Sequence, residues 1–119
     1  MANEISVSAT LAVANGNASY SKTFSKSFTQ AAVGGPTPGF VTIGTSEESQ
    51  AFSELTTEGW IRMENLDTTN YVEWGFATAV YGGRLEAGEI ALFRVNPAAT
   101  IYLKANTAAC KMLIDCFED

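Results

Sequence analysis

The sequence predicts an all-β protein, with a single antiparallel β-sandwich or jelly-roll-like domain over residues 1–119. Three observations support this class. Apolar and polar residues alternate with a period of two in several segments, as they do in strands that bury one face. These segments are short, and turn signals separate them at intervals of roughly 8–12 residues. The 119 residues are 46% hydrophobic, which is enough for one domain with a substantial core.

The first two segments predict a β-hairpin. Residues 5–13 alternate aliphatic side chains with polar ones, and Asn15-Gly16 follows, a pair typical of tight hairpin turns. In the return segment, residues 19–30, a Tyr and two Phe recur at every fourth position, which is also helical spacing. Ser and Thr fill the alternate positions and disfavour a helix interior. We therefore expect a strand, with Lys22 and Lys26 on its aromatic face, where inward charges can protect a sheet edge.

The remainder of the chain predicts several short strands. Residues 34–39, GGPTPG, are expected to form a loop because Pro and Gly interrupt a ladder, and residues 46–50, SEESQ, are expected to form another. Strands are expected at 40–43, 60–63, 71–76, 89–95, 101–104 and 110–117. The last of these also fits a helical pattern, but the repeated short strands favour a strand.

Two of these strands are apolar on both faces. Residues 90–95 and 110–117 carry large apolar side chains at odd and even positions alike. Such strands are either central in a two-layer core or covered by another subunit. We therefore take Phe93, Leu113 and Phe117 as candidate protein-interface residues.

The stretch NLDTTNYVEWG, residues 65–75, allows two interpretations. Aromatic rings beside Asn and Asp are the chemistry of a carbohydrate site, in which a ring stacks on the sugar and polar groups bind its hydroxyls. The candidate glycan-binding residues are Trp60, Tyr71, Trp74, Asn65, Asp67 and Asn70.

The alternative interpretation is a turn followed by a core strand. Residues 67–70 would form the turn. Val72, Trp74 and Phe76 would then share one strand face and supply core volume, and this grouping favours the core interpretation. Tyr71 and Glu73 would lie on the opposite face, where any protein or glycan partner would have to bind.

Catalytic and metal-binding patterns are sparse. The chain has no histidine, the commonest general base. Its thirteen acidic residues could in principle include a glycosidase pair, although solvated surface carboxylates are the simpler interpretation. Glu64, Asn65 and Asp67 could bind calcium through oxygen, but their spacing does not match an EF-hand loop, and a turn is favoured. We expect no enzymatic activity, cofactor or metal.

The two cysteines are expected to be free thiols. In a strand, Cys110 and Cys116 would lie about 20 Å apart, too far for a disulfide, and buried free thiols suit a reducing compartment. The chain shows no targeting signal, so synthesis in the cytoplasm is expected. A net charge of −6 argues against nucleic acid and anionic membranes as direct partners.

The second half of the chain resembles small structural proteins of tailed bacteriophage virions. The resemblance rests on the order of strands and turns in three segments: EGWIRMENLDTTNYVEWG (58–75), RLEAGEIALFRV (84–95) and TIYLKANTAACKMLIDCFED (100–119). It covers about half the chain and includes no catalytic residue.

This resemblance implies a non-enzymatic virion protein that attaches by surface complementarity. A capsid decoration (cement) protein is the leading expectation, and head-fibre, neck and tail components also fit. The implied partners are the major capsid protein or other virion proteins, and a homo-oligomer is expected. The alternative is a carbohydrate-binding or adhesion module of a phage fibre or tail.

Overall fold

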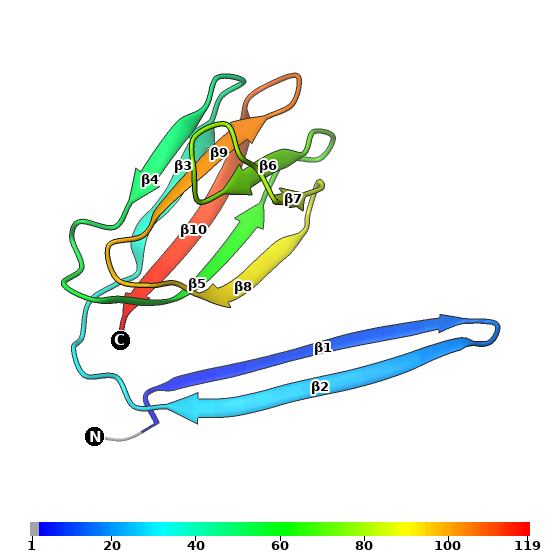
Figure 1. Ribbon diagram of the computed structural model, residues 1–119, viewed down its shortest axis with the longest axis horizontal. Helices are drawn as coiled ribbons and strands as arrows, with labels where there is room; N and C mark the ends of the chain where they lie inside the picture. Colours follow the sequence, from blue (N-terminus) through cyan, green and yellow to red (C-terminus); the bar gives the residue numbers. More distant parts are fainter. Residues whose placement is uncertain (1–2) are drawn as a thin grey trace. The chain divides into compact units, whose positions relative to one another are not determined.

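The computed structural model describes residues 3–119, which form strands and loops without a helix. The chain divides into two units, residues 1–31 and residues 32–119. The first contains a long hairpin and the second a β-sandwich, and each is described by itself (Figure 1).

The hairpin, here called the arm, consists of β1 (Ile5–Asn15) and β2 (Ala18–Phe28). The strands pair antiparallel along their whole length. Gly16 opens the two-residue turn with a φ of 57°, a conformation that glycine adopts without steric cost. The predicted hairpin is therefore confirmed.

The two faces of the arm differ sharply, because residues paired across the strands share a face. One face is apolar and aromatic with two lysines; the other is made of Ser, Thr and Ala. The arm forms a two-stranded sheet of its own, whereas the sequence predicted one sandwich over residues 1–119. Its Ser/Thr/Ala face has little apolar surface to bury, so it is unsuited to a place within a two-layer core.

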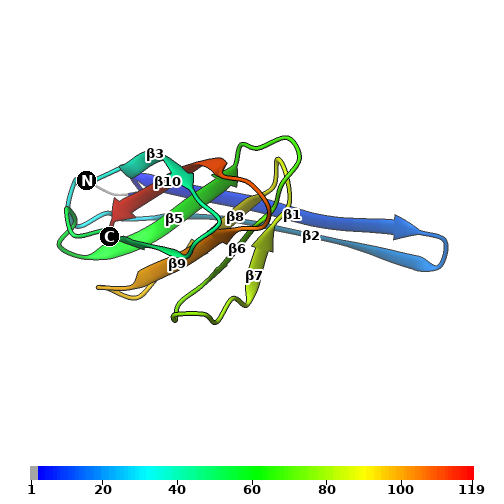
Figure 2. The ribbon, with the colours of Figure 1, turned by 90° about the horizontal axis from the view of Figure 1, so that it is seen from above.

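The sandwich contains two four-stranded antiparallel sheets (Figures 1 and 2). One sheet has the order β3-β10-β5-β8 and the other the order β4-β9-β6-β7. The strands are β3 (Thr37–Ile43), β4 (Glu48–Ala51), β5 (Glu58–Asn65), β6 (Val72–Gly75), β7 (Gly83–Leu85), β8 (Ile90–Arg94), β9 (Thr100–Ala105) and β10 (Cys110–Glu118). This eight-stranded order across two sheets is that of a jelly roll, and the predicted all-β class is confirmed.

The core lies between the two sheets. β10 alternates strictly, with Met112 and Ile114 buried and Leu113 partly exposed on the outward side, so the strand prediction for residues 110–117 is confirmed. The fully buried large side chains come from both sheets and the loops between them: Ile43, Phe52, Ile61, Met63, Val72, Ile101, Leu103, Met112 and Ile114.

Each of two predicted loops is in part an edge strand, whereas residues 34–36 and 46–47 lie outside the strands as predicted. β3 begins at Thr37, within the predicted 34–39 loop, and Pro38 pairs with Asp115. Proline is compatible with an edge strand because only one side of that strand needs ladder hydrogen bonds. β4 occupies most of the predicted 46–50 loop and pairs only with β9. Its polar side chains are tolerated because the edge faces solvent.

The strand in the NLDTTNYVEWG stretch is shorter than predicted. β6 ends at Gly75, so Phe76 lies beyond it and is 54% exposed. The expectation that Val72, Trp74 and Phe76 all point into the core is therefore wrong for Phe76. Val72 is fully buried and Trp74 packs against the core.

Candidate functional site

The turn after β5 is built by the three polar residues proposed to bind a glycan. The Asn65 side chain is fully buried. Its Nδ2 donates to the carbonyls of Asn70 (2.9 Å) and Leu85 (3.1 Å), and its Oδ1 accepts from the Asp67 amide (3.0 Å). Asn65 thus ties the turn to β7 and has no surface to offer a sugar. Its assignment as a glycan ligand is corrected.

Asp67 and Asn70 complete the same turn. The Asp67 carboxylate accepts from the amides of Thr69 (2.9 Å) and Asn70 (2.6 Å). These two backbone hydrogen bonds, with that to Asn70 the stronger influence, lower the pKa of Asp67. The Asn70 Oδ1 accepts from the Thr107 hydroxyl at 2.6 Å. The predicted 67–70 turn is therefore confirmed.

The three candidate aromatic residues do not form one platform. Trp74 stacks on Phe93 with ring centroids 5.0 Å apart and an 11° angle between the planes, so one of its faces is occupied. The guanidinium carbon of Arg84 lies 3.9 Å from the centre of the Tyr71 ring. Trp60 lies on β5, in the other sheet. The rings and the polar turn therefore do not converge as the glycan interpretation required.

The candidate interface residues are distributed over different faces. Leu113 and Phe117 lie on the outward side of β10. Phe93 packs against the core with its ring on Trp74, so it does not share that outward face. Tyr71 and Glu73 belong to the β6 segment of the other sheet. The structure therefore places Leu113 and Phe117 on one outward surface, and it places Tyr71 and Glu73 beside Arg84 in the other sheet.

The outward faces of the two sheets have different chemistry. In the β4-β9-β6-β7 sheet, Lys104, Glu73 and Arg84 form one cross-strand row of alternating charge. In the β3-β10-β5-β8 sheet, the outward rows mix charges with apolar side chains. We call this second surface the apolar outer face, defined by Phe40, Leu113, Ile90 and Leu92. Phe40 is 65% and Ile90 51% exposed.

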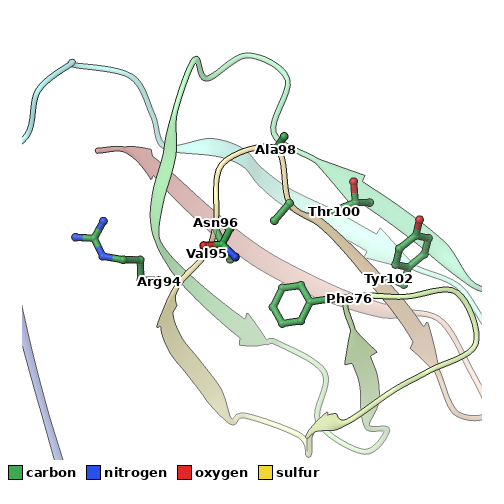
Figure 3. Close-up of a pocket in the computed structure, with 8 residues that line it drawn as sticks. Phe76, Arg94, Val95, Asn96, Ala98, Thr100 and Tyr102 are labelled. Carbon is green, nitrogen blue, oxygen red and sulfur yellow. The ribbon is translucent and has the colours of Figure 1, made fainter.

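A pocket of about 570 Å³ lies near one end of the sandwich (Figure 3). Among the lining residues, Phe76 follows β6 and Tyr102 lies on β9. The others belong to the end of β8, the loop after it and the start of β9: Arg94, Val95, Asn96, Ala98, Ala99 and Thr100. Arg94 points away from the other labelled side chains (Figure 3), and its Nη1 lies 2.7 Å from Asp119 Oδ2. The lining offers the rings of Phe76 and Tyr102, the Asn96 amide and the Thr100 hydroxyl, and it contains no carboxylate.

Sequence reasoning did not find this pocket. The loop that walls it is held by the Glu58 carboxylate, which accepts from the Ala98 amide at 2.7 Å. These residues are forty positions apart, so local pattern does not connect them. The exposed Phe76 had been placed in the core. Pro97 indicates a break between two strands here but gives no sign of a pocket.

The carboxylates with shifted pKa values serve as acceptors in loops. Hydrogen bonds from Tyr81 and the Ala79 amide lower the pKa of Glu47. The Thr56 amide lies 2.6 Å from Glu118 Oε1 and lowers the pKa of Glu118. A glycosidase acid needs a raised pKa, so these groups are suited to stabilising loops as anions.

Residues 3–119 contain neither a cluster of metal-binding side chains nor an exposed thiol. Among residues 3–119, no group of three or more His, Cys, Asp or Glu side chains is placed to hold a metal ion. Two of the three residues considered for calcium binding lie on opposite sides of β5. Glu64 forms an ion pair with Arg62 at 2.9 Å on the outward side, whereas Asn65 points inward. Cys110 and Cys116 are free and buried, as predicted. Burial raises the pKa of both thiols, that of Cys116 to about 11.

No family model matches the chain, and no curated protein or solved structure matches it. Within residues 3–119, no helix is long and apolar enough to cross a membrane.

Proposed function

We propose that this chain is a non-enzymatic structural protein of a tailed bacteriophage virion, and specifically a capsid decoration (cement) protein. Its partners would be the major capsid protein or other virion proteins, and it would be made in the host cytoplasm before joining the particle. The C-terminal pattern of residues 58–75, 84–95 and 100–119 motivates the phage assignment.

The observation that carries a role in assembly is the exposed apolar face of the arm. Leu11, Val13, Tyr20 and Phe24 are 45–65% exposed along one side of two 11-residue strands. Large exposed apolar side chains along one surface, here interspersed with Lys22 and Lys26, mark a protein-interaction site. A two-stranded hairpin is also marginally stable by itself, so binding would stabilise the arm and join the chain to its partner.

The sandwich supports the same role. The buried side chain of Asn65 and the carboxylates with lowered pKa values, Glu47 and Glu118, hold turns and loops in place. This is expected of a rigid scaffold. Jelly rolls occur both in viral capsid proteins and in lectins, so the fold is compatible with this proposal without deciding it. A decoration protein stabilises its particle by binding the assembled form, by about 2.7 kcal/mol per site at a free concentration 100 times Kd.

The test uses particles that lack the chain. Purified protein is mixed with them, and co-sedimentation and the temperature of particle disruption are measured. We expect saturable binding and a higher disruption temperature. The double variant Leu11→Ser, Phe24→Ser should bind more weakly, whereas the control Thr10→Ser, Thr23→Ser on the opposite arm face should behave as wild type. Absence of binding by the folded wild-type chain would count against the proposal.

A second candidate is a carbohydrate-binding or adhesion module of a phage fibre or tail. The observation that favours it is the pocket beside Phe76, where Tyr102, Asn96 and Thr100 offer hydroxyl and amide groups. A glycan array with wild type and Phe76→Ala tests it. The candidate requires a specific glycan signal that Phe76→Ala removes; no signal above background from the wild type would exclude it for the glycans on the array.

A further inference from the structure

The apolar face of the arm has a defined composition. Cross-strand pairing brings Lys26 opposite Val7, Phe24 opposite Ala9 and Lys22 opposite Leu11, so apolar side chains alternate with two cationic ones along one surface. At the usual rise per residue, an 11-residue strand is roughly 36 Å long. A partner for this surface must therefore be long, apolar in part and negatively charged.

Net charge differs strongly between the two units of the chain. Of the seven basic and thirteen acidic residues, two basic and one acidic lie in residues 1–31, leaving five and twelve in residues 32–119. The arm unit thus has a net charge of +1 and the sandwich unit −7. Face-to-face packing of two arms would bring Lys22 and Lys26 of each copy together, whereas a sandwich attracts them.

The apolar outer face of the sandwich supplies apolar side chains and two carboxylates on a unit whose net charge is −7. One of its cross-strand rows runs Phe40–Leu113–Glu64–Ile90, and the next runs Pro38–Asp115–Arg62–Leu92. Glu64 and Asp115 therefore lie among apolar side chains, together with the basic Arg62 and, further along β10, Lys111. β10, which runs along this face, has nine residues, roughly 30 Å, a length comparable with that of the arm.

Two contacts within this face would have to rearrange when a partner binds. Arg62 and Glu64 form an ion pair at 2.9 Å with side chains 42% and 27% exposed. The Lys111 ammonium lies 5.2 Å from the centre of the Phe40 ring. Exposed ion pairs contribute little to stability, so the exchange of Arg62 for a lysine of the arm as the partner of Glu64 would cost little. The other outward face carries a row of alternating charges at Lys104, Glu73 and Arg84.

We propose that the arm of one copy docks by its apolar face on the apolar outer face of a second copy, with Lys22 and Lys26 against Glu64 and Asp115. Each copy has one arm and one receiving face, so the contact joins different surfaces of successive copies and can close a ring. This deepens the proposed role in assembly by naming the first partner as another copy of the chain. It is tested on the purified chain alone, so its failure is distinct from failure to bind a particle.

The first experiment compares association of matched charge variants by sedimentation equilibrium. Lys22→Gln, Lys26→Gln removes two positive charges from the docking side of the arm. Ser21→Glu, Ser25→Glu adds two negative charges to its opposite face, and both chains have a net charge of −8, two below the wild-type −6. We expect wild type to associate, the lysine variant to associate at least tenfold more weakly, and the serine variant to retain most of its association. A monomeric wild type, or equal loss in both variants, would overturn the proposal.

The second experiment identifies the surfaces by cross-linking between copies. One preparation carries Lys22→Cys and the other Glu64→Cys, and they are mixed and treated with an added oxidant. The native thiols of Cys110 and Cys116 are buried, and circular dichroism of each variant verifies folding. We expect a disulfide that joins the two different variants. Cross-linking only between two Lys22→Cys chains would establish arm-to-arm pairing, and absence of any cross-link between chains would exclude docking on a second copy; either result refutes the proposal.

Discussion

Replacement of Asn65 by alanine tests the conclusion that the NLDTTN stretch is structural. The side chain is fully buried and makes hydrogen bonds to the Asn70 carbonyl, the Leu85 carbonyl and the Asp67 amide. A neutral hydrogen bond contributes about 1 kcal/mol to stability, so the loss of three predicts destabilisation by about 3 kcal/mol. For a domain of this size that corresponds to a fall in Tm of roughly 12–24 °C.

The assay is urea unfolding followed by tryptophan fluorescence, with the midpoint and slope fitted separately. Asn70→Ala is the matched control, because it removes the exposed contact with Thr107 but keeps the Asn70 carbonyl that accepts from Asn65. The control should lose about 1 kcal/mol or less. If Asn65→Ala were no more destabilising than Asn70→Ala, the argument that Asn65 anchors the turn would be refuted.

Three further predictions concern packing, thiols and pH. A Cβ at Gly83 would lie 2.3 Å from Cε2 of Trp74, so Gly83→Ala should lower the unfolding free energy by about 1–3 kcal/mol; an unchanged urea midpoint would contradict the packing. With its pKa raised to about 11 by burial, Cys116 should resist a thiol reagent at pH 8 until the chain is unfolded; rapid labelling of native protein would contradict its burial. The pKa of Glu118 in the folded protein is lowered from 4.5, so its contribution to stability is present above pH 4.5 and is lost as the pH falls through the folded pKa. Glu118→Gln should therefore reduce the loss of unfolding free energy at acid pH. An unchanged acid dependence of the unfolding free energy would contradict this.

Much of the fold follows from local pattern. The alternation in residues 5–13 and 110–117 and the Asn15-Gly16 signal are short-range features, and the corresponding strands and hairpin form as predicted. The prediction from sequence was wrong where the position of a strand in its sheet overrides the structural preference of its residues. Pro38 is accommodated because β3 is a sheet edge, and edge position depends on which strand pairs with which.

The candidate site was less predictable for a similar reason. Residue types near 65–75 suggested a sugar site, but Asn65 is directed to Leu85, twenty positions away. Phe76 was assigned to the core by strand parity, which no longer applies once β6 ends at Gly75. The pocket around Phe76 depends on contacts between distant loops, which periodicity does not reveal.

Titration of undecorated particles with the purified chain tests the proposed function most directly. The measured quantity is the number of chains that co-sediment per major capsid protein as the free concentration rises. A decoration protein predicts saturation at a fixed ratio set by capsid symmetry, accompanied by a higher disruption temperature of the particle. Folded protein that stays in the supernatant at every concentration, with the disruption temperature unchanged, would contradict the account.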